Sequence, residues 1–118
     1  MAFGQAHEAP SVSGTRWALR ITVGSAPPAD NEVRFSGGPV DGTFVDRNDH
    51  RGTWHQDGAT VTWTYTSVPD LTNVFVATLK DDGRVMAGTN SGVWQGQKFS
   101  GTFAGTRLTE KGRPPLSF

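Results

Sequence analysis

Large aromatic residues alternate with threonines in the stretch HRGTWHQDGATVTWTYTS, residues 50–67. Trp54 lies before a predicted hairpin turn at Asp57-Gly58, Trp63 and Tyr65 lie after it, and threonines alternate with these rings in both segments. Because side chains alternate between the two faces of a strand, we expect the rings on one face and the hydroxyls on the other. Such a wall of rings predicts either a solid core or the lining of a small-molecule site.

Two features favour the lining of a site. Four tryptophans are hard to pack into one small solid core, and Gly42, Gly52 and Gly101 lie on the same faces as neighbouring rings, where they remove side-chain volume. We therefore predict a cavity for an apolar or aromatic small molecule. Its predicted ligand-binding residues are Trp17, Phe35, Phe44, Trp54, Trp63, Tyr65, Trp94 and Phe103.

An enzyme remains an alternative, although no nucleophile elbow, phosphate loop or paired-carboxylate motif is present. A small barrel can catalyse cyclisation or isomerisation of a hydrophobic substrate with one or two polar residues. Tyr65 is then the candidate acid, and Arg20, Arg34 or Arg107 would stabilise a developing anion.

Carbohydrate binding is a second alternative. The segment TNSGVWQGQ, residues 89–97, places Trp94 among asparagine and glutamine side chains, and its ring could stack on a sugar. An ordinary polar loop explains the same composition.

Metal and cofactor chemistry have no support in the sequence. Asp46, Asp49 and His50 lie close together, but their spacing is not that of an EF-hand, and we interpret them as a turn. The absence of cysteine excludes disulfides and thiolate zinc sites. We expect no metal and no cofactor.

The charge balance bears on partners. Eleven basic residues match eleven acidic ones, which argues against a nucleic-acid partner. A net charge of zero also leaves little repulsion between copies, so a homo-oligomer is an open expectation.

The expected localisation follows from two sequence patterns that are absent. No apolar run is long enough for a transmembrane helix, and the start MAFGQAHEAPSVSG lacks the pattern of a signal peptide. A cytoplasmic location is the default expectation, unless a leader has been removed.

These side chains must be positioned by short strands. The 118 residues suit one domain, and 15 glycines with 7 prolines suit many turns and little helix. Alternation and turn residues predict strands at 15–23, 32–36, 40–46, 51–56, 59–67, 73–80, 84–89 and 98–108, a turn at 90–92, and a short irregular piece at 92–97.

A meander of about eight strands would expose two edges unless it closes, and eight strands close around an interior that fits side chains or one small ligand. We predict an all-β fold, a single antiparallel up-and-down β-barrel. The barrel domain spans residues 15–109, after a flexible N-terminal arm at 1–14 and before a tail at 110–118. The arm is expected to be dispensable for folding.

The hairpins "GTW" and "VTWTY" resemble those of calycin barrels, the group that holds lipocalins and avidins. In those families Gly and Trp begin the first strand, and an Arg on the last strand covers this Trp. Gly14, Trp17 and Arg107 resemble that set, with one residue more between Gly and Trp than in lipocalins. The resemblance implies a calycin-like barrel and a binding role, and it names no ligand.

Overall fold

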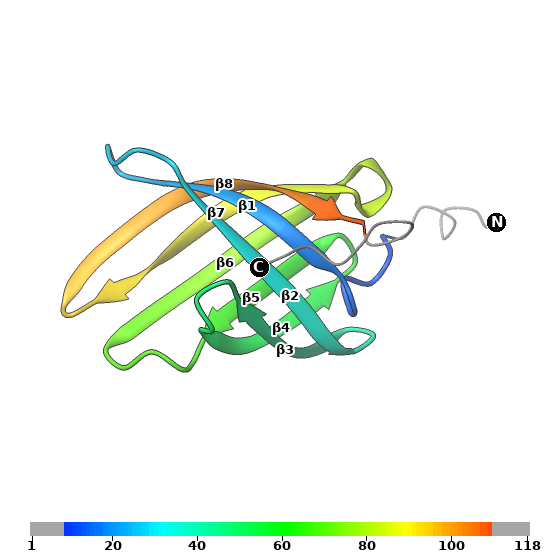
Figure 1. The fold of residues 1–118 in the computed structure, drawn as a ribbon, viewed down its shortest axis with the longest axis horizontal. Helices are drawn as coiled ribbons and strands as arrows, with labels where there is room; N and C mark the ends of the chain where they lie inside the picture. The colour runs from blue at the N-terminus through cyan, green and yellow to red at the C-terminus, as the bar shows by residue number, and fades with distance from the viewer. Residues whose placement is uncertain (1–8, 110–118) are drawn as a thin grey trace.

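The chain folds into one closed barrel of eight antiparallel strands (Figure 1). The computed structural model describes residues 9–109. A 3-10 turn, η2, connects β6 to β7. The elements are β1 (Arg16–Val23), β2 (Ala29–Gly38), β3 (Asp41–Asp46), β4 (Arg51–Asp57), β5 (Thr60–Tyr65), β6 (Leu71–Lys80), η2 (Asp81–Gly83), β7 (Val85–Trp94) and β8 (Gln97–Leu108).

Each strand pairs with its neighbours in sequence, and β1 pairs with β8 to close the barrel. The β1–β8 ladder runs from Arg16 opposite Leu108 to Val23 opposite Gly101. This closure removes the two edges that an open meander would expose. The predicted all-β, up-and-down barrel is therefore confirmed.

Aromatic and hydroxyl side chains separate as their alternation predicts. Trp54 lies opposite Trp63 in the β4–β5 ladder, and both side chains are buried inside the barrel. The next pair along, Thr53 and Thr64, faces outward. The interior is the core of the protein, because it holds nearly all of the buried hydrophobic residues.

One local expectation about a turn is corrected. The predicted turn at 90–92 is wrong, because β7 continues through it to Trp94 and the chain turns at Gln95 and Gly96. Pairing on both sides, with β6 and β8, outweighs the turn-forming composition of this stretch. Between β4 and β5, Gly58 alone has a positive φ, 61°, which is the pattern of a type II′ hairpin turn.

The segment just before β1 covers one end of the barrel, which we call the closed end. Val12 is 2% exposed and belongs to the core, and its backbone N–H donates to Gln56 Oε1 at 2.9 Å. The Gln56 amide in turn donates to the Pro10 carbonyl oxygen at 2.9 Å. Within the expected arm at 1–14, residues 9–14 thus contact the barrel, while 1–8 lie outside the described residues, as does the tail at 110–118.

Val12→Ala should therefore lower the free energy of unfolding by about 2 kcal/mol, because it removes two buried carbons and leaves a cavity. Val40→Ala is the matched control, since Val40 is 49% exposed and should change stability by under ~0.5 kcal/mol. Denaturant unfolding measures both. Equal, small effects would show that the segment before β1 does not stabilise the barrel.

Candidate functional site: the mouth of the barrel

The aromatic residues in the middle of the barrel pack against one another. The Trp63 ring stacks on Phe75 at 5.0 Å, and its centroid lies 5.1 Å from Phe35 and 5.5 Å from Phe103, both in edge-on geometry. Phe44 and Tyr65 form another edge-on pair at 4.9 Å. Such contacts are typical of a well-packed aromatic core. The rings face the interior as predicted, and in the middle of the barrel they serve as its core.

The inward glycines do not leave free space beside these rings. A Cβ on Gly52 would collide with the Thr64 carbonyl oxygen and with the Phe44 ring. Glycine at this position lets neighbouring strands and rings approach closely, which is its role at tight bends of a barrel.

A concavity lies at the end of the barrel opposite Val12, which we call the mouth. This end carries the turns at 24–28, 47–50, 66–70 and 95–96. There the β1–β2 and β7–β8 hairpins diverge (Figure 1), because β8 extends four residues beyond the last pair with β1. The hollow between them has a volume of about 730 Å³. It is lined by Val23, Gly24, Ser91, Gly92, Val93, Lys98, Phe99 and Ser100.

Two rows of inward-facing residues connect this hollow to the core. In the outer row Gly92 lies between Asn73 on β6 and Phe99 on β8. In the inner row Asn90 lies between Phe75 and Gly101, and Gly101 pairs with Val23. Each row joins residues that line the hollow to an asparagine. The rows are Asn73–Gly92–Phe99 and Phe75–Asn90–Gly101–Val23.

Both asparagines carry a buried oxygen without a partner. Asn90 is 3% exposed, and within the described part of the chain neither its Oδ1 nor the Oδ1 of Asn73 accepts a hydrogen bond. The indole N–H of Trp63 is likewise unpaired, whereas that of Trp54 donates to the Ser36 carbonyl oxygen at 2.8 Å. Buried polar groups are nearly always hydrogen-bonded, so three exceptions in and next to these rows mark the region as unusual.

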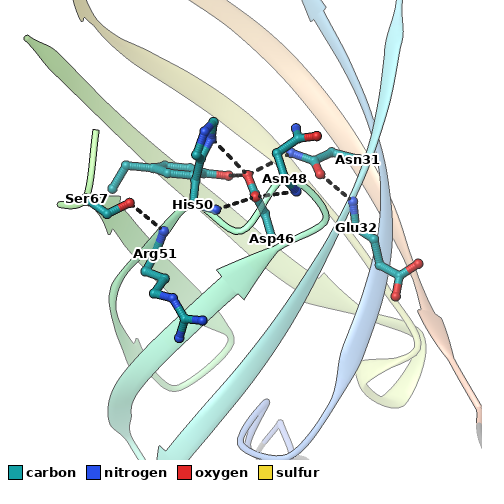
Figure 2. Close-up of polar contacts among 8 residues, drawn as sticks. Asn31, Glu32, Asp46, Asn48, His50, Arg51 and Ser67 are labelled. Carbon is teal, nitrogen blue, oxygen red and sulfur yellow. Dashed lines mark hydrogen bonds and ion pairs between the residues drawn. The ribbon is translucent and has the colours of Figure 1, made fainter. Parts of the chain in front are cut away.

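A second polar group lies across the mouth, around Asp46 (Figure 2). Its carboxylate accepts from the backbone N–H groups of Asn48 and His50, from the Asn31 amide at 3.2 Å and from the Tyr65 hydroxyl at 2.9 Å. The His50 ring nitrogen lies 3.8 Å away. This carboxylate holds the β3–β4 turn, which agrees with the interpretation of these residues as a turn.

The environment of Tyr65 makes it a poor acid at neutral pH. Burial raises the pKa of its hydroxyl far above the ordinary value, and the Asp46 charge and hydrogen bond raise it further. The Asn31 side chain opposes this shift. The neutral hydroxyl is therefore the stable form in the fold.

The other candidate catalytic residues lie apart from Tyr65. Arg20 forms an exposed ion pair with Asp30 at 3.1 Å on the outer surface, and Arg34 is exposed. Arg107 faces Trp17 near the closed end. A shared catalytic role for these side chains stays a prediction, and the fold does not gather them at one site.

Trp94, the remaining predicted ligand-binding residue, ends β7 at the mouth and is 43% exposed. The segment expected as a sugar-binding loop, 89–97, forms the end of β7, the turn and the start of β8.

The described residues contain no cluster of three or more metal-ligating side chains. Among the same residues, 9–109, no helix has the length and apolar character to cross a membrane. No protein-family model matches the chain, and comparison with curated proteins finds no relative.

Sequence reasoning missed the residues of the hollow. None of the eight predicted ligand-binding residues lines it, and Phe99 and Val23 do. Alternation along β8 places Phe99 on the inner face, but only the unequal lengths of β1 and β8 expose it. Asn90 was not predicted as an inward-facing strand residue, because the stretch 90–92 has the composition of a turn.

Trp63→Ala should lower the free energy of unfolding by about 3–5 kcal/mol, as expected for a large side chain removed from a packed core. Trp94→Ala is the control, because that ring is half-exposed and its loss should cost under ~1 kcal/mol. Denaturant titration by circular dichroism gives both values. A small loss for Trp63→Ala would contradict a filled interior.

The raised pKa of Tyr65 predicts a loss of stability at alkaline pH. Its contribution is fully present below the unfolded pKa of about 10 and falls as the pH rises above that value, because the unfolded state then releases the proton first. Tyr65 is the chain's only tyrosine, so tyrosinate absorbance reports it alone. Tyrosinate should appear only with unfolding, and Tyr65→Phe should flatten the alkaline loss; an ordinary titration in the folded protein would contradict this.

Proposed function

We propose that the protein binds an apolar or aromatic small molecule at the mouth of the barrel. The observation that carries the proposal is the hollow of about 730 Å³, whose volume falls in the range of small-molecule sites. Val23, Val93 and Phe99 supply apolar contact surface, and the hydroxyls of Ser91 and Ser100 supply polar contacts. The opposite end is covered by Val12, so ligand access is at the mouth.

The resemblance to calycin barrels supports the same proposal. Those barrels carry an Arg on the last strand that covers the Trp of the first strand, and Arg107 is paired with Trp17 in the β1–β8 ladder. A calycin-like assignment would make a binding role at one end of the barrel the natural expectation.

Titration with Nile red, an uncharged apolar dye, tests the proposal. We expect a saturable rise in dye fluorescence, and Val23→Trp should weaken binding at least about tenfold by filling the hollow. Val76→Trp is the control, because Val76 is an exposed residue on the outside of β6. Absence of saturable binding, or equal binding by Val23→Trp, would overturn the proposal.

A further inference from the structure

We propose that the ligand carries a hydrogen-bond donor, an N–H or O–H on an otherwise apolar ring, which Asn90 and Asn73 accept. This inference rests on the proposed function and specifies the chemistry of its ligand. Its basis is the pair of unpartnered Oδ1 atoms on the two rows that lead inward from the hollow.

Asn90 lies one inward position below the hollow, and its oxygen is buried there. On β7 the next inward residue toward the mouth is Gly92, which lines the hollow and has no side chain to cover the amide. Gly101 lies directly across from Asn90, and a Cβ there would come within 3.0 Å of Asn90 Oδ1. Two glycines thus flank the amide, one along the strand and one across it.

Asn73 extends the same acceptor surface. It lies across from Gly92 and diagonal to Asn90, a relation that puts the two residues about 7–8 Å apart on one face. A flat ring that passes Phe99 and Val23, which line the hollow, and reaches the row below Gly92 would meet the two acceptors. Neither asparagine is used in the Asp46 network, so both oxygens are available to a ligand.

Charge and polarity define the ligand further. Both acceptors are neutral, so a neutral donor satisfies them without placing a charge in the core, which would be costly. The aromatic floor beneath them, Phe75 and Phe103, favours a flat ring. The chemical class is therefore a neutral, aromatic molecule with at least one N–H or O–H.

Indole and N-methylindole are the matched probes, because they differ in the donor and by one methyl group. Calorimetric titration of the whole chain should give about tenfold tighter binding for indole, the value expected for one hydrogen bond to a buried acceptor. Asn90→Leu should remove this preference and keep binding of N-methylindole. Asn73→Leu should reduce the preference in the same direction.

Asn48→Leu is the control, since Asn48 is an exposed residue of the β3–β4 turn and its replacement should leave the preference intact. Amide proton–nitrogen spectra show that each variant is folded, and in the wild-type protein indole should shift the side-chain NH₂ signals of Asn90 and Asn73.

Three results would overturn the inference. Equal affinity for the two probes would show that the ligand's hydrogen-bond donor does not contribute to binding. The proposed function would stand, because both probes would still bind. A preference that survives both Asn→Leu changes would show that the amides only bind water. Failure of both probes, with Nile red still bound, would exclude this ligand class alone, and failure of the dye as well would remove the proposed function.

Discussion

Closure of the sheet by the β1–β8 ladder is the constraint on which the rest of the structure depends. Once Arg16–Val23 pairs with Gly101–Leu108, every strand has two neighbours, and each residue is committed to the inside or the outside. Eight strands enclose a space about one layer of large side chains wide. The aromatic residues therefore meet across the centre, and Trp63 contacts rings from three other strands.

This packing forces any binding site toward an end. The middle of the barrel is filled by rings, and Val12 with Gln56 covers the closed end. On β7 the inward residues pass from Met86 through Gly88 and Asn90 to Gly92, so little side-chain volume fills the barrel beside the hollow.

The sequence predicts the barrel well because its main signal, alternation, is local. Trp54, Trp63 and Tyr65 could be assigned to one face without any knowledge of their partners. The same signal does not tell a core from a cavity, because both place rings inward. That distinction depends on which rings meet across the barrel, as Trp63 and Phe103 do, and such contacts join residues far apart in the chain.

The hollow at the mouth could not be predicted from the sequence, for a related physical reason. The hollow forms where β8 extends beyond its last pair with β1. These two strands lie at opposite ends of the chain, so their relative lengths are not a local property of the sequence. The sequence Asn90-Ser91-Gly92 is typical of a turn. Asn90 lies in a strand because it pairs with both β6 and β8. A buried asparagine with an unpaired oxygen lowers the stability of the protein without a ligand, since a buried unsatisfied acceptor costs about 1–3 kcal/mol. A partner that satisfies this oxygen recovers the loss on binding, so the cost to the fold and the selectivity of the proposed site come from the same atom.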